Sequence, residues 1–187
     1  MDSVKALKPN EKTNTQAHSF VTGNIEGIDQ GLYLLEKLND EQYQYAAKPY
    51  VESSTGAHLR HINDLYFALM AQEQNMGLIN YDQRRRGALV ETDRATGIQE
   101  LLQIRNWLES LDQNDLFRSV RIQSETSIYQ QQIFQMESTL QRELLFVSSH
   151  TTHHFSVIRV NAQACGIKTD NIFSYAPATA SYLRSLK

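Results

Sequence analysis

The chain has 187 residues, of which 41% are hydrophobic and 21% charged, with a formal net charge of −3 at pH 7. This length fits one domain, and the even spread of Lys and Arg gives no basic stripe for a phosphate backbone, which argues against nucleic acid as a partner. No apolar run approaches the roughly 20 residues that span a bilayer, no signal peptide is evident and Cys165 has no disulfide partner, so we expect a cytoplasmic protein that does not bind a membrane.

The N-terminal residues separate into a polar stretch and a helical pattern. Residues 1–19 are polar, contain Pro9 and lack periodicity, so we expect an N-terminal arm there and one domain over residues 20–187. From about Phe20 to Tyr45, apolar residues recur every three or four positions, which predicts a helix although each internal glycine costs about 1 kcal/mol. The stripe consists of Ile25, Ile28, Leu32 and Leu35.

Two further helices are indicated in the middle of the chain. Ser53 or Ser54 can cap a second helix that continues to about Met76. Thr92 or Asp93 can cap a third helix over "TDRATGIQELLQIRNWLESL". Its buried side is predicted to contain Ile98, Leu101, Leu102, Ile104, Leu108 and Leu111.

The last third of the chain predicts a hairpin followed by a long helix. Val120 and Ile122 alternate with polar residues, which favours a short hairpin. Ser138 and Gln141 form a capping-box pattern at the start of the last helix, and Gly166 is suited to end it. Four long helices with a short β-hairpin insertion before the last one predict an all-α four-helix bundle.

Histidines cluster on two of the predicted helices. His150 and His154, in "HTTHH", are four residues apart and share one helical face at the edge of the buried stripe, whereas His153 points further towards solvent. Either His58 or His61 can face this pair from the second helix, and periodicity does not choose between them. Three imidazoles would leave coordination positions open, as in catalytic zinc sites. The same pattern also fits a polar helix edge that binds no metal.

The motifs "GAHLRHINDLY" and "HTTHH" resemble those of the DinB/YfiT-like superfamily of metal-binding four-helix bundles. The resemblance implies that His61, three residues before Asp64, is the second-helix ligand, and that His150 and His154 are the last-helix ligands. Many relatives have Arg-Gly-Gln after the second histidine pair, whereas this chain continues "HHFSVIR", so a substrate pocket is not carried over. His58 and His153 become neighbours of the ligands, able to orient them or to line the cavity.

The same resemblance implies a metal-dependent enzyme, either a hydrolase or a thiol S-transferase that uses a low-molecular-weight thiol. The expected cofactor is a divalent ion, zinc or nickel, since imidazole accepts several metals. No motif identifies a general base, and Glu73, Glu91 and Glu143 are all candidates. The alternative is a non-catalytic dimer with vestigial histidines that binds a metal or a small molecule. A role in DNA damage, suggested by the family name, has no basic face to support it.

Two irregular segments are rich in aromatic residues and arginine. In "NYDQRRRG" we expect Tyr81, Arg84 or Arg86 to lie near the cavity mouth, although such a run is also typical of a solvated turn. The C-terminal tail is predicted to fold against the bundle through Phe173, Tyr175 and Tyr182.

Apolar residues outside the buried stripes favour a homodimer. The hairpin or the N-terminal arm could cover the same surface within one chain. The residues concerned are Phe67, Met70, Phe146, Val157 and Val160.

Overall fold

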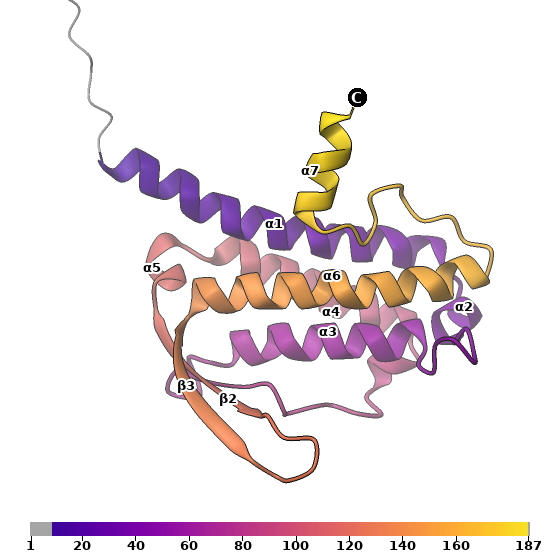
Figure 1. The fold of residues 1–187 in the computed structure, drawn as a ribbon, viewed down its shortest axis with the longest axis horizontal. Coiled ribbons are helices and arrows are strands. Elements are labelled where there is room, and N and C mark those ends of the chain that lie inside the picture. The colour runs from indigo at the N-terminus through magenta and orange to yellow at the C-terminus, as the bar shows by residue number, and fades with distance from the viewer. Residues whose placement is uncertain (1–8, 187) are drawn as a thin grey trace, which may run out of the picture.

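The computed structural model describes residues 9–186, with side chains from Val21 onward. The fold is mainly helical and carries one small sheet (Figure 1). Its helices are α1 (Pro9–Lys37), α2 (Asp40–Gln44), α3 (Thr55–Met70), α4 (Arg94–Ser110), α5 (Gln113–Leu116), α6 (Leu140–Ala164) and α7 (Pro177–Ser185), with the 3-10 turn η1 (Leu89–Glu91). Its strands are β1 (Leu78–Asn80), β2 (Ser119–Glu125) and β3 (Ile133–Thr139).

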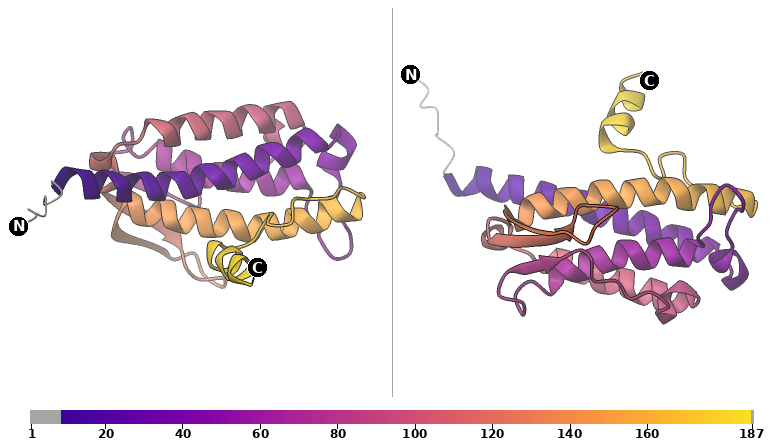
Figure 2. Two further views of the ribbon diagram at one scale, coloured as in Figure 1. Left: turned by 90° about the horizontal axis from the view of Figure 1, so that it is seen from above. Right: turned by 60° about the horizontal axis from the view of Figure 1, so that its bottom comes forward.

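The four long helices α1, α3, α4 and α6 lie side by side and enclose the core (Figure 2). Helices α1 and α3 each contact both α4 and α6, so each long helix has two long neighbours. The predicted apolar stripes supply this core, with one exception on α4, where Leu102 is exposed. Fully buried representatives of the four helices are Ile28, Leu59, Leu101 and Ile158.

Capping side chains fix where three of these helices begin. Ser54 Oγ accepts from the backbone N–H of Ala57 at the start of α3, and Asp93 caps α4 in the same way. Each is one of the two residues predicted for its cap. The cap of α6 is Thr139, whose side chain accepts from the backbone N–H of Arg142. The predicted capping box is wrong, because Ser138 lies one residue before the cap and its hydroxyl donates to Glu143 instead. A cap must have extended backbone and precede the first helical turn, and Thr139 meets both conditions.

Three predicted helix boundaries are corrected by the structure. Helix α1 begins at Pro9, within the segment predicted to be an arm, because proline is suited to the first turn of a helix; residues 1–8 lie outside the described part. It also ends at Lys37, and Asn39 caps the separate helix α2. Helix α3 ends at Met70 rather than Met76, which is exposed and has positive φ beside Gly77.

The sheet has the order β1–β2–β3, with β1 parallel to β2 and β2 antiparallel to β3. Val120 and Ile122 are buried, which confirms the predicted inward-facing alternation of the hairpin. The strand β1 was not predicted. Its central Ile79 is fully buried and pairs with Ile122, which ties the chain after α3 to the hairpin.

The C-terminal segment turns back along the helices after Gly166, whose positive φ ends α6 as predicted. Phe173 is buried and stacks on Phe155 of α6 at 5.1 Å between ring centroids. The segment then forms α7, an unpredicted helix whose axis runs across those of the long helices (Figure 1) and that has no buried residue. Tyr182 therefore does not anchor the tail, because its side chain is exposed.

The apolar residues that favoured a dimer differ in how far their side chains are exposed. Phe67 and Met70 are half-buried and pack against the core, Val157 is also half-buried, and Phe146 and Val160 are exposed. Among the described residues, no helix combines the length and apolar character needed to cross a membrane.

Candidate metal centre

Three histidines from two helices bring their ring nitrogens together between α3 and α6. The Nε2 atoms of His61 and His150 are 2.9 Å apart, and those of His150 and His154 are also 2.9 Å apart. One potential ligand atom from each of the three lies within 4.8 Å of the others. The i, i+4 spacing on α6 places His150 and His154 on adjacent turns, and the packing of α3 against α6 brings in His61.

His58 contacts the same group from one turn earlier on α3. Its Nδ1 lies 3.1 Å from Nδ1 of His154, so it approaches the ring nitrogen that does not face the other two histidines. Its Nε2 is buried and has no hydrogen-bond partner among the described residues. His153 is exposed, with its ring 5.2 Å from that of His154, and no hydrogen bond to it is found in the described part of the chain. The structure thus distinguishes the two histidines of α3. The Nε2 atom of His61 meets that of His150, whereas His58 contacts the opposite ring nitrogen of His154.

Arg84 binds the outer side of His61. Its Nη1 lies 3.1 Å from His61 Nδ1, and a guanidinium has only donors, so this ring nitrogen accepts the hydrogen bond. Tyr81 is connected to the site through its ring contact with Phe146, whose ring in turn lies 5.8 Å from that of His150. Arg86 forms no hydrogen bond or ion pair among the described side chains, but its positive charge is near enough to contribute to lowering the pKa of Arg84.

Burial and neighbouring charge keep these imidazoles neutral at pH 7. Burial, then the positive charge of Arg84, lowers the pKa of His61 to about 4. Burial, then the neighbouring histidines, lowers the pKa of His154 to about 3. The pKa values of His58 and His150 are also lowered, mainly by burial. A neutral imidazole keeps the lone pair that a metal needs. Because the lowered pKa values keep these rings unprotonated at pH 7, the rings are able to bind a metal ion without first losing a proton.

The donor set fits a divalent transition metal. Two nitrogens bound to one ion at about 2.0–2.2 Å lie about 2.8–3.6 Å apart, and both short Nε2 separations fall in this interval. Three imidazoles suit zinc, nickel, copper or iron better than calcium or magnesium, which prefer oxygen ligands. No carboxylate among the described residues hydrogen-bonds to the rings of these histidines.

The three glutamates considered as general bases are all engaged elsewhere. Glu73 pairs with Arg118, and Glu91 accepts from Arg60 Nε at 2.8 Å. Glu143 is fully buried and accepts from Tyr81, Ser138 and Arg142. None of the three is placed to take a proton at the histidine cluster.

Asp64 belongs to a buried ionic network beside the histidines. Its carboxylate binds Arg60 at 3.2 Å and Arg85 at 2.6 Å, and Arg85 continues to Glu100 of α4 at 2.7 Å. Sequence analysis missed Arg60, Arg85 and Glu100. The i, i+4 spacing of Arg60 and Asp64 was a readable signal for one pair, but Arg85 and Glu100 meet only through the fold.

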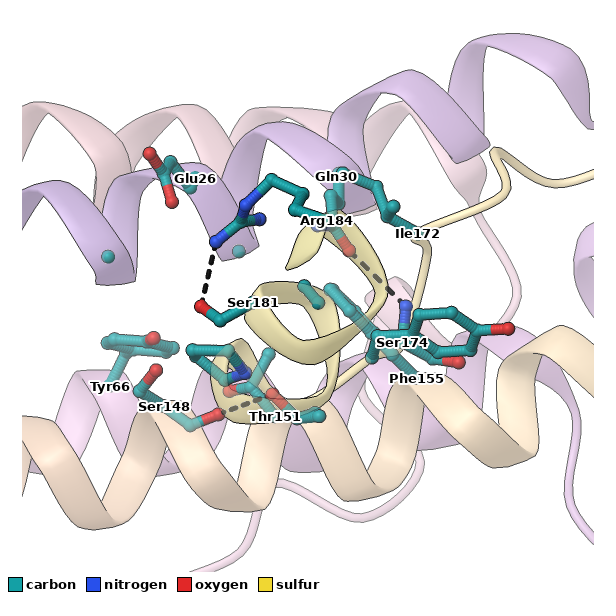
Figure 3. Close-up of a pocket in the computed structure, with 16 residues that line it drawn as sticks. Glu26, Gln30, Tyr66, Ser148, Thr151, Phe155, Ile172, Ser174, Ser181 and Arg184 are labelled. Atoms are coloured by element: carbon teal, nitrogen blue, oxygen red, sulfur yellow. Dashed lines mark hydrogen bonds between the residues drawn. The ribbon is translucent and has the colours of Figure 1, made fainter. Parts of the chain in front are cut away.

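Two cavities adjoin these elements on different sides. One, of about 440 Å³, is lined by Asp64, Arg84 and Arg85 together with residues of α3 and the loop around β1. The other, of about 170 Å³, lies between α1, α6 and α7 (Figure 3). Arg184 and Glu26 project towards it there, and Arg184 donates a 2.8 Å hydrogen bond to Ser181.

Comparison with known proteins assigns no family. No family model matches the chain. The chain is similar to a protein named FK506-binding protein 5 from Rhizopus delemar, with 24% identity over 107 residues. The matched region is 57% of this chain and 28% of that protein, so the chain spans well under half of its length.

Proposed function

We propose that the chain is a metal-dependent enzyme of the DinB/YfiT-like four-helix-bundle type, in which His61, His150 and His154 hold one divalent ion, zinc or nickel. The observation that carries the proposal is the convergence of three Nε2 atoms from α3 and α6. A divalent ion bound there would supply Lewis-acid chemistry by lowering the pKa of a water or a thiol.

His58 supports this proposal as the residue that orients His154. A histidine that ligates through Nε2 carries its proton on Nδ1, and metal ligands usually donate that proton to a fixed acceptor. Nδ1 of His58 lies 3.1 Å from Nδ1 of His154 and can accept it. Because burial lowers the pKa of His58, its ring stays neutral and keeps the accepting lone pair.

The surroundings favour a hydrolase or a thiol S-transferase over proton-relay chemistry. The three candidate ligands are neutral, and the nearby carboxylates are held in pairs with Arg60, Arg85 or Arg142. A reacting water or low-molecular-weight thiol would therefore lose its proton to solvent rather than to a fixed glutamate. This chemistry requires binding and orientation from the protein, and the packing of α3 against α6 around the three histidines supports that role.

Metal analysis of protein purified without a histidine tag or chelator tests the proposal. After equilibration with zinc or nickel and removal of excess ion, we expect one ion per chain in the wild type and none in His61→Ala or His150→Ala. His153→Ala is the matched control, because His153 is exposed on the same turn and should leave the ion bound. A wild type that retains no ion, or a control that loses it, contradicts the proposed centre.

Activity then separates an enzyme from a binding protein. Thiol-conjugation and ester-hydrolysis substrates are compared between loaded protein, metal-free protein and the His61→Ala variant. Turnover by the loaded protein, but not by the metal-free protein or the His61→Ala variant, supports an enzyme. A loaded protein that turns over none of these substrates favours the non-catalytic metal-binding bundle.

A further inference from the structure

Arg84 differs from its neighbour in the same loop. Arg85 binds Asp64 and Glu100, and its guanidinium is part of the fold. Arg84 forms none of the ion pairs found among the described side chains, and its hydrogen bond goes to His61 Nδ1. A guanidinium that contacts a candidate ligand but has no carboxylate of its own is available for another partner.

The hydrogen bond to His61 and a metal on His61 exclude each other. Arg84 can only donate, so Nδ1 of His61 accepts and the proton of the neutral ring is on Nε2. A metal on Nε2 needs that lone pair, which places the ring proton on Nδ1 instead. Two N–H groups would then face each other across 3.1 Å, and the guanidinium has to leave.

We propose that metal binding releases Arg84 from His61, and that the released guanidinium binds an oxyanion of the substrate, a carboxylate or a phosphate. This inference rests on the proposed function and names its substrate class. A planar guanidinium suits both oxyanions, since it can donate two parallel hydrogen bonds. Arg84 is thereby a specificity-determining residue beside the metal.

The carboxylates around Arg84 are already occupied. Asp64 is held by Arg60 and Arg85. Asp82 accepts from the backbone N–H of Glu125 at 2.7 Å and from Ser124 Oγ at 3.1 Å. A released Arg84 thus meets no unengaged acid among these neighbours, and an external anion would be its partner.

The cavity beside Arg84 can accept the rest of such a substrate. Its volume of about 440 Å³ suits a small organic molecule. Phe67 and Ala71 supply apolar wall, while Asn75 and Asn80 supply polar lining. Arg84 lines this cavity and also contacts His61, so it lies between the cavity and the candidate metal centre.

The first test compares metal affinity in two matched variants by calorimetric titration with Co²⁺. Arg84→Met removes the hydrogen bond and the charge, whereas Arg86→Met removes a charge from the same loop without a contact to His61. We expect Arg84→Met to bind Co²⁺ about five- to tenfold more tightly than the wild type, because no hydrogen bond has to be broken. Arg86→Met should stay within about twofold, in line with a screened surface charge. Equal affinities for the wild type and Arg84→Met overturn the displacement.

The second test follows the visible spectrum of Co²⁺-loaded protein during titration with inorganic phosphate, and with acetate in parallel to separate the two oxyanions. We expect the loaded wild type to bind at least one of them about tenfold more tightly than loaded Arg84→Met. Calorimetric titration of the metal-free wild type with the same anions should show weak binding of both. Unchanged anion affinity in Arg84→Met overturns the role of Arg84 and leaves the metal centre intact. A wild type that binds no Co²⁺ overturns both this inference and the proposed function, and the first titration identifies that case. Arg86→Met should keep the wild-type melting temperature, whereas metal-free Arg84→Met should melt slightly lower, because it loses the hydrogen bond to His61.

Discussion

Tyr81 donates a 2.7 Å hydrogen bond to Oε2 of Glu143, a carboxylate that is fully buried. Ser138 and Arg142 bind the other oxygen, Oε1, at 2.6 and 2.7 Å. Burying a carboxylate is unfavourable unless its oxygens are hydrogen-bonded, so these contacts allow Glu143 to occupy the interior. The arrangement joins the loop after β1 to β3 and α6, and it places the Tyr81 ring against Phe146 near His150.

Replacing Tyr81 with Phe should therefore destabilise the fold. The variant keeps the ring and leaves one oxygen of a buried carboxylate without its donor, which typically costs about 1–3 kcal/mol. Urea unfolding monitored by circular dichroism measures the change. Tyr129→Phe is the control, because Tyr129 is exposed on the hairpin and should show no change. Equal losses in the two variants would mean that the Glu143 contact contributes nothing.

The buried pair of Asp64 with Arg60 gives a larger expected effect. Asp64→Asn removes the charge that Arg60 and Arg85 share, and removing one partner of a buried pair costs about 3–5 kcal/mol. The matched control is Glu52→Gln, which breaks an exposed pair with Lys48 and should change the free energy of unfolding by less than about 1 kcal/mol. Chemical denaturation measures the free energy of unfolding of both variants. Similar losses in Asp64→Asn and Glu52→Gln would show that the network around Asp64 is solvated.

Two glycines on different helices should respond to alanine in opposite directions. A Cβ on Gly56 would lie 2.2 Å from the backbone oxygen of Glu91, so Gly56→Ala must push α3 away from η1 and should cost about 1–3 kcal/mol or more. A Cβ on Gly27 meets nothing within 4 Å, so Gly27→Ala should stabilise α1 by about 0.5–1 kcal/mol. Melting temperatures measured side by side check the signs. A stabilised Gly56→Ala would refute the close approach.

Local sequence signals predicted much of this fold and missed its long-range parts. The spacing of apolar residues gave the four long helices, and Ser54 and Asp93 were readable as caps because a cap depends on its own first turn. The strand β1 has only three residues and pairs in parallel with a strand distant in sequence, so no local sequence pattern predicts it. Helix α7 has no buried residue and hence no stripe to detect.

The candidate site shows the same division. The four-residue spacing of His150 and His154 placed them on one face, but periodicity left His58 and His61 equivalent. The difference between these two histidines depends on how α3 is rotated about its axis relative to α6. This rotation directs Nε2 of His61 to Nε2 of His150, and Nδ1 of His58 to Nδ1 of His154. The contact of Arg84 with His61 depends on how the loop after β1 returns to α3, which its sequence does not specify.

The neutral histidines also predict how stability depends on pH. Burial lowers the pKa of His61 to about 4 and that of His154 to about 3, whereas the unfolded chain has histidine pKa values of about 6.5. Between these values the unfolded chain binds more protons than the folded chain, so this stability is complete above about pH 6.5 and is lost as the pH falls towards 4. Urea unfolding of chelator-treated protein should therefore show a free energy that declines from about pH 7.5 to about pH 5, before most carboxylates titrate. His154→Phe should flatten the decline, and His153→Ala, which changes an exposed ring, should not. A wild-type free energy that stays constant over this range would mean that the cluster is protonated as easily in the folded chain as in the unfolded one.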